Sequence, residues 1–127
     1  MLTINELTEE QARRTLDEQE LPEELRTSSK FSALMATQDW CPDSSAVSRW
    51  MKKHARKGLP EDIDVTVYTV HYNKLPFFDE FREMKEQVWQ NFFIPYIRYY
   101  QDGSLIDESN RVSADDFFAT FRHSGAA

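Results

Sequence analysis

The chain has 127 residues, of which 40% are hydrophobic, and a formal net charge of −7 at pH 7. This length predicts one domain that folds without a metal or a disulfide, and the acidic balance disfavours nucleic acid, whose phosphates need basic partners. A single cysteine permits no internal disulfide, no apolar run is long enough to span a membrane, and residues 1–10 lack the apolar core of a signal peptide, so we expect a cytoplasmic protein without a membrane partner.

The first 27 residues predict a helical segment. Thr8 and Gln11 have the spacing of a capping box at the start of a helix. Pro22 can open a second, short helix, because proline is tolerated at the first helical position. We therefore expect a single domain in which residues 1–27 form an extra helical segment and residues 28–122 form the core.

A buried strand and a long helix are predicted next. Residues 31–38 are apolar enough for a buried strand. Over residues 42–57 the apolar positions recur at helical spacing, and Gly58 and Pro60 are expected to end that helix. The basic run at residues 49–57 has two readings: cations that complement the negative end of the helix dipole, which we favour, or a binding patch for an acidic partner.

Another strand and another helix follow. Residues 63–70 are rich in β-branched and aromatic residues and give the clearest strand. Pro76 opens a long helix that we expect to run to about Gln90. Its buried stripe is predicted to contain Phe77, Phe81, Met84 and Val88, and its solvated face Glu83, Lys85 and Glu86.

A hairpin and a last helix complete the pattern. Residues 96–100 and 104–108 are predicted to be antiparallel strands, because Asp102-Gly103 is a strong hairpin signal. Ser113 then caps a helix. The earlier strand–helix–strand order implies a parallel pair with a right-handed crossover. The sequence thus predicts an α/β fold with a mixed central sheet of about four strands flanked by helices.

The only cysteine lies where the first of these strands gives way to a helix, in the stretch Trp40-Cys41-Pro42-Asp43-Ser44. The positive end of the helix dipole and free backbone N–H groups favour a thiolate at such a position. A single intracellular cysteine is more often buried and inert. The helix start favours the alternative, a nucleophilic Cys41.

This order of elements, with Trp40-Cys41-Pro42-Asp43 at a strand-to-helix junction, resembles the thioredoxin-like superfamily. Ile94-Pro95, followed by a strand and by Asp102-Gly103, is similar to the family's cis-proline strand and hairpin. The resemblance covers roughly residues 28–122. It implies a thioredoxin-like fold and thiol–disulfide exchange with protein disulfides or glutathione.

The resemblance also implies roles for individual residues. Cys41 takes the place of the attacking cysteine, Trp40 that of the tryptophan that shields it, and Pro95 that of the cis-proline packed beside it. Ile94 would offer backbone groups to an extended substrate peptide. Pro42 and Asp43 would border the same substrate-binding surface.

Two departures from the family pattern bear on the chemistry. Ser44 stands where the second, resolving cysteine would be, and its hydroxyl cannot displace sulfur at neutral pH. Met35 occupies a position where many members carry a buried acid, so no proton acceptor is expected beneath the site. Ser44 can donate a hydrogen bond to a thiolate at Cys41, whereas the carboxylate of Asp43 opposes a second negative charge nearby.

Three interpretations of the function remain open. In the first, the protein is a monothiol oxidoreductase without a bound cofactor, and glutathione or another external thiol releases its mixed disulfides. In the second, it is a non-catalytic interaction module that uses the groove at Pro95. In the third, Ser44 is an engineered replacement for a cysteine. No metal is expected, because His54, His71 and His123 lack metal-ligand spacing with one another or with Cys41.

Overall fold

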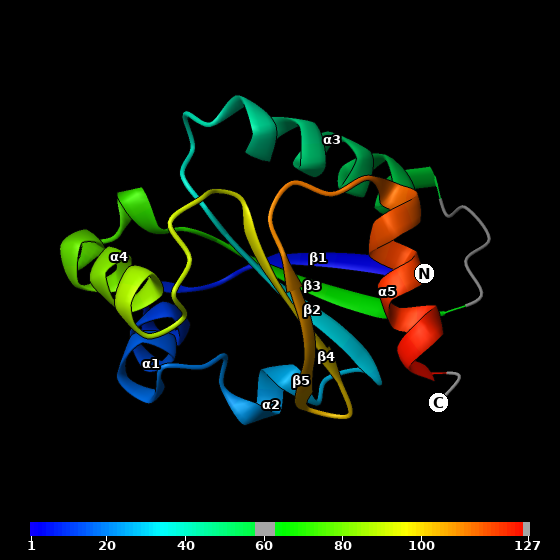
Figure 1. The fold of residues 1–127 in the computed structure, drawn as a ribbon, viewed down its shortest axis with the longest axis horizontal. Helices are drawn as coiled ribbons and strands as arrows, with labels where there is room; N and C mark the ends of the chain where they lie inside the picture. Colours follow the sequence, from blue (N-terminus) through cyan, green and yellow to red (C-terminus); the bar gives the residue numbers. More distant parts are fainter. Residues whose placement is uncertain (58–62, 126–127) are drawn as a thin grey trace.

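In a computed structural model that describes residues 1–57 and 63–125, a five-stranded sheet lies between two layers of helices (Figure 1). The strands are β1 (Leu2–Glu6), β2 (Phe31–Thr37), β3 (Val65–His71), β4 (Tyr96–Gln101) and β5 (Ser104–Ser109). The helices are α1 (Glu9–Glu18), α2 (Glu23–Arg26), α3 (Pro42–Lys57), α4 (Phe78–Gln87) and α5 (Ala114–Gly125), with a short 3₁₀ helix, η1 (Tyr72–Lys74). Within the described ranges no helix is long and apolar enough to cross a membrane. The helix end expected at Gly58 and Pro60 lies outside them.

The strands follow the order β1-β3-β2-β4-β5, so β2 is the central strand. β3 pairs in parallel with both β1 and β2, whereas β4 runs antiparallel to β2 and to β5. The predicted mixed sheet flanked by helices is confirmed. Since β4 runs opposite to β2, Ala36 near the end of β2 pairs with Tyr96 at the start of β4. This register brings the segment after β2 and the segment before β4 to the same edge of the sheet.

The helical description of residues 1–27 was wrong at its start, because β1 is a strand. It extends the sheet by pairing in parallel with β3, from Leu2 beside Val65 to Glu6 beside Thr69. Leu2 is buried while most other residues of β1 are exposed, so this edge strand shows little of the apolar pattern that marks a strand. The sheet therefore has five strands rather than about four. α1 begins at the predicted capping box between Thr8 and Gln11.

Side chains alternate across β2 and bury two apolar clusters, one on each face of the sheet. Leu34 points to the face that α1 and α4 cover, and Met35 to the face that α3 and α5 cover. The first cluster includes Tyr68, Phe81, Tyr96 and Tyr100. The second includes Val67, Met51, Phe117 and Phe121. β2 is thus packed on both faces, and this packing fixes the position of its C-terminal end, from which the next segment leaves.

α4 is shorter than expected, and two predictions about its faces were wrong. The helix ends at Gln87, so Val88 is 45% exposed instead of buried. Lys85, expected in solvent, is 1% exposed. The chain leaves the helix after Gln87 and folds back, and the Trp89 indole donates a hydrogen bond to the Gln19 carbonyl at the end of α1 (3.0 Å). This turn carries the loop of residues 88–95 over Lys85.

The hairpin and the last helix form as predicted. Asp102 and Gly103 both have positive φ angles, 52° and 85°, as a tight two-residue hairpin turn requires. A Cβ on Gly103 would also lie 2.8 Å from the Thr27 side chain, so glycine is needed for space as well as for conformation. Ser113 caps α5 by accepting a hydrogen bond from the Asp116 backbone (3.2 Å).

Candidate functional site

Cys41 lies immediately before α3, in the connection from the central strand. Its N–H donates to the Gln38 carbonyl (3.3 Å), and its carbonyl accepts from Ser45 (3.0 Å), as in a first helical turn. The Cys41 side chain is buried, with 6% of its surface exposed. Its thiol points to the Ile94 carbonyl, with Sγ 3.8 Å from the oxygen. The Ile94–Pro95 peptide bond is cis. The C-terminal end of β2 and the N-terminal end of β4 lie at the same edge of the sheet, and the fold thus brings Cys41 and Ile94 together there.

Ser44 is the buried neighbour of Cys41 in the first turn of α3. It is 4% exposed, and its hydroxyl accepts a hydrogen bond from the hydroxyl of Thr37, the last residue of β2. This contact fixes the Ser44 oxygen against the end of the central strand. Thr37 was not foreseen as part of the site, because its role depends on a contact between a strand end and a helix start. Donation from Ser44 to a Cys41 thiolate stays a prediction.

The segment before Cys41 is clamped to η1 by a reciprocal pair of hydrogen bonds. The Asn73 amide donates to the Asp39 carboxylate (2.7 Å), and the Asp39 N–H donates to the Asn73 side-chain oxygen (3.1 Å). The Asn73 hydrogen bond lowers the pKa of Asp39. Trp40 is 65% exposed and donates its indole N–H to Gln38. The segment that is held to η1 therefore presents an exposed aromatic side chain, that of Trp40, directly before Cys41.

Pro42 and Asp43 open α3, and Asp43 has a counter-charge that the sequence did not indicate. Arg111, in the segment between β5 and α5, lies 3.4 Å from the Asp43 carboxylate. Both side chains are more than half exposed, so this ion pair is a weak one. It nevertheless places a cation against the carboxylate that opposes a thiolate at Cys41.

Met35 is fully buried on β2, as part of the apolar cluster under α3 and α5.

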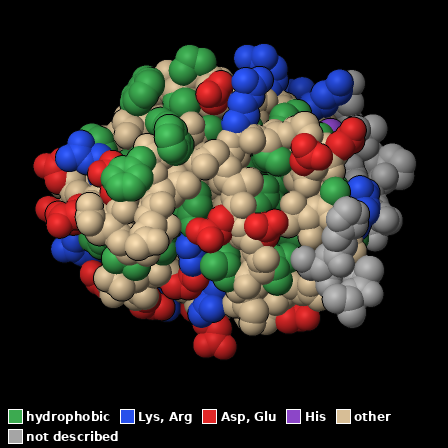
Figure 2. All heavy atoms as spheres, viewed as in Figure 1, with side chains coloured by type: hydrophobic (Ala, Val, Ile, Leu, Met, Phe, Trp, Pro, Cys, Tyr) green, Lys and Arg blue, Asp and Glu red, His purple; other side chains and the backbone are tan. Residues whose placement is uncertain are grey.

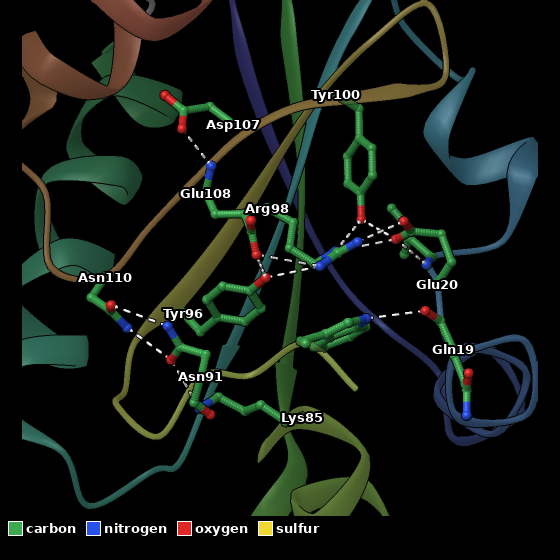
Figure 3. Close-up of polar contacts among 12 residues, drawn as sticks. Gln19, Glu20, Lys85, Asn91, Tyr96, Arg98, Tyr100, Asp107, Glu108 and Asn110 are labelled. Atoms are coloured by element: carbon green, nitrogen blue, oxygen red, sulfur yellow. Dashed lines mark hydrogen bonds and ion pairs between the residues drawn. The ribbon is translucent and has the colours of Figure 1, made fainter. Parts of the chain in front are cut away.

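The loop of residues 88–95 is held by two polar side chains that the sequence reading did not select (Figure 3). The buried Lys85 ammonium donates to the Asn91 carbonyl (2.9 Å), the Asn91 side chain (3.2 Å) and the Phe93 carbonyl (2.7 Å). Asn110, just after β5, donates to the Pro95 carbonyl (3.0 Å). Lys85 and Asn110 therefore position the backbone around Ile94, against which the thiol lies. Lys85 was assigned to the solvated face of its helix, and Asn110 was missed because an isolated polar residue in a loop carries no periodic signal.

Exposed aromatic side chains border this edge. Phe92 is 65% exposed and Phe93 is 70% exposed, on the same loop that leads to Ile94 and Pro95. Figure 2 shows hydrophobic side chains gathered at the upper left of the molecule, where Figure 1 has this loop and the start of α3. Phe92 and Phe93 precede Ile94, and Trp40 precedes Cys41, so both of the segments that meet at the thiol carry exposed apolar surface. Exposed apolar patches of this kind mark sites of protein or ligand contact.

The buried Lys85 predicts a rise in stability at alkaline pH. Burial lowers the pKa of Lys85 to about 8 from its ordinary value of 10.5. Between these values the unfolded chain binds a proton that the folded protein does not, so the free energy of unfolding rises with pH. Relative to a Lys85→Met variant, the protein should gain about 2 kcal/mol between about pH 8 and about pH 9.5.

Urea unfolding at several pH values measures this difference. Lys53→Met, a substitution at an exposed position of α3, is the matched control and should leave the pH dependence unchanged. Equal pH dependence of the Lys85→Met variant and the parent protein would show that Lys85 loses no proton in this range.

Comparisons with known proteins establish the fold. No family model matches the sequence, and no curated protein sequence does. The structure is similar to that of thioredoxin f from spinach chloroplast, with a TM-score of 0.63 and 13% identity over 97% of this chain and 87% of that one. It is also similar to oxidized thioredoxin O2 from Arabidopsis thaliana (TM-score 0.62, 16% identity, 95% of this chain and 93% of that one) and to thioredoxin f2 from Chlamydomonas reinhardtii (TM-score 0.60, 14% identity, 95% of both).

These similarities show that the chain has a thioredoxin-like fold. The resemblance expected over roughly residues 28–122 extends over nearly the whole chain, since the matches cover 95% of it or more. β1 and α1 are therefore parts of this fold and not additions to it. At 13–16% identity to these thioredoxins the comparison concerns architecture. The chemistry depends on the residues at the edge of the sheet.

Proposed function

We propose that the protein is a thiol–disulfide oxidoreductase in which Cys41 is the nucleophile. One observation carries the proposal: the thiol of Cys41, at the start of α3, lies 3.8 Å from the backbone carbonyl of Ile94. A sulfur in that position can meet a disulfide of a peptide that binds along the Ile94 backbone. The thioredoxin-like fold and the position of Cys41 at a helix start support the same chemistry.

The proposed reaction starts when Cys41 loses its thiol proton to solvent and its thiolate attacks one sulfur of a protein disulfide. A bond forms between Cys41 and that sulfur, the substrate disulfide breaks, and the second substrate sulfur leaves with the electron pair as a thiolate. A glutathione thiolate then attacks the Cys41 sulfur and releases the reduced substrate. A second glutathione restores Cys41 and leaves as glutathione disulfide. Two glutathione molecules thus supply the two electrons that the substrate gains.

Ser44 explains why an external thiol is needed in this scheme. It is buried beside Cys41 and carries a hydroxyl in the place from which a second sulfur would attack. The exposed Trp40, Pro42 and Asp43 on one side, with Ile94 and Pro95 on the other, would border the substrate peptide. Phe92 and Phe93 add apolar surface for its side chains.

Reaction with glutathione disulfide tests the proposal. The native protein is expected to acquire one glutathione at Cys41 faster than the same chain unfolded in urea at the same pH, because folding places the thiol at a helix start. Intact-mass spectrometry over time measures both rates. Cys41→Ser should form no adduct. A native thiol that reacts more slowly than the unfolded one would make Cys41 a structural cysteine and overturn the proposal.

A non-catalytic interaction module is the second candidate, and the exposed aromatic side chains favour it. Trp40, Phe92 and Phe93 offer contact surface whether or not the thiol reacts. In this case binding of a protein partner should survive Cys41→Ser and should weaken when Phe92 and Phe93 are replaced by serine. A partner lost on Cys41→Ser alone would instead indicate capture through a mixed disulfide.

A further inference from the structure

A concave site lies beside α3, and Cys41 is not among the residues that line it. It is a cleft of about 330 Å³ between the first half of α3 and the end of β3. Every lining side chain except that of Asp39 can donate a hydrogen bond, and these donors are Gln38, Ser44, Ser45, Ser48, Arg49, Lys52 and His71. A volume of this size is at the small end of the range for sites that hold small molecules.

Four of these donors form one face of the helix. Ser45, Ser48, Arg49 and Lys52 stand at positions i, i+3, i+4 and i+7, the spacing that aligns side chains along one side of an α-helix. Their groups are two hydroxyls, a guanidinium and an ammonium, and the two cations have no acceptor atoms. A helix face made of such groups matches a ligand that presents several acceptor oxygens.

Among the described residues, two cations at the cleft have no counter-charge. Asp39 also lines the cleft, but its carboxylate is bound by Asn73 and lies 3.6 Å from Lys74. Glu6, in the adjoining cavity, pairs with His71 at 2.9 Å. Arg49 and Lys52, by contrast, have no ion pair to any carboxylate in the described part of the chain. In a protein with a net charge of −7 this local excess of positive charge is unusual.

We propose that this cleft binds a small molecule through a phosphate or carboxylate group. Arg49 would pair with two oxygens of the group, since a guanidinium matches the geometry of oxyanions. Lys52 would add a second charge, and the hydroxyls of Ser45 and Ser48 would donate to the remaining oxygens. The site is additional to the proposed thiol chemistry and does not use Cys41.

The basic run at residues 49–57, which we expected to complement the negative end of the helix dipole, contains cations in two different positions. Figure 2 shows Lys and Arg side chains gathered over α3 at the top of the molecule. Arg49 and Lys52 line the cleft, whereas Lys53 and Arg56 are exposed on the same helix and do not line it. The run therefore contains a pair of cations at the proposed site and a pair that can serve as its control.

Nuclear magnetic resonance titration of the whole chain tests the proposal, with inorganic phosphate as one probe and succinate as the other, at constant ionic strength. Backbone signals of Ser45, Ser48, Arg49 and His71 are expected to shift and saturate with at least one probe. The probe that binds more tightly identifies the group. The double variant Arg49→Gln, Lys52→Gln should bind it at least about tenfold more weakly. The control Lys53→Gln, Arg56→Gln removes the same charge from the same helix and should stay within about twofold of the parent.

Three outcomes would contradict the proposal. Shifts that do not saturate with either probe would mean that the cleft holds no oxyanion. Equal weakening in both double variants would mean that the anion responds only to the overall charge of α3. Cys41→Ser should bind the probe as the parent does, so failure of the thiol chemistry and failure of this site are separately visible. Loss of binding in Cys41→Ser would also contradict a site that is independent of the thiol.

Discussion

A Ser44→Cys variant is expected to turn over protein disulfides, with a rate at least about 100-fold above that of the parent chain when dithiothreitol is the electron donor. Position 44 lies three residues after Cys41 in the first turn of α3, and its side chain is 4% exposed. A thiol there would attack the mixed disulfide within the same molecule, and well-oriented intramolecular attack has a large advantage over reaction with a thiol from solution. Insulin reduction, followed by turbidity, measures the rate.

The neighbouring serine supplies the control. Ser45→Cys adds the same thiol one residue later, where the side chain is exposed and lines the cleft beside α3. This variant should stay close to the parent rate. A Ser44→Cys protein as slow as the parent would favour the interaction module over an enzyme, whereas a fast one would show that the site lacks only its second sulfur.

Replacing Arg98 with methionine is expected to lower the free energy of unfolding by about 3–5 kcal/mol. The Arg98 side chain is 7% exposed and pairs with Glu20 at 2.7 Å. Its guanidinium also donates to the hydroxyls of Tyr96 (2.8 Å) and Tyr100 (3.1 Å), and it lies 4.6 Å from the ring centre of Trp89 (Figure 3). Methionine fills similar space but leaves the Glu20 carboxylate without its cationic partner, with hydrogen bonds only from the Tyr100 hydroxyl and the Leu21 N–H.

Arg111→Met is the matched control, because Arg111 also pairs with a carboxylate but is 67% exposed. It should cost less than about 1 kcal/mol. Urea unfolding measures both variants. Adding Glu20→Gln to Arg98→Met should recover part of the loss, since the unpaired charge is then gone. Equal costs for Arg98→Met and Arg111→Met would mean that the buried network contributes no more than a surface ion pair.

The parts of the fold that sequence reading predicts well are those with a local cause. The hairpin at Asp102 and Gly103 follows from their tolerance of positive φ, and the caps at Thr8 and Ser113 follow from side chains that bond the helix start. β1 was missed because an edge strand with one well-buried residue lacks a pattern. It is a strand because it pairs with β3, a segment distant in the sequence, and the residues of β1 alone do not indicate this pairing.

The candidate site divides in the same way. Cys41 and the Ile94–Pro95 pair stand out in the sequence, and the resemblance implied that they would meet, which the Cys41 thiol and Ile94 carbonyl do. Lys85 was assigned to solvent because helical spacing alone describes an isolated helix. It is buried because the following loop turns back over it, and only the folded chain supplies the three oxygen atoms that accept its hydrogen bonds.

The place of β2 in the sheet has a consequence for how the site would respond to partial unfolding. β2 pairs with strands on both sides, whereas β1 and β5 are edges. Opening of an edge strand leaves the pairing of β2 with β3 and β4 intact, so the amide hydrogens of β2 should be among the last to exchange with solvent. The support beneath Cys41 and its contact with Ile94 would then persist until the whole sheet opens. The candidate site would thus be lost together with the fold, and not before it.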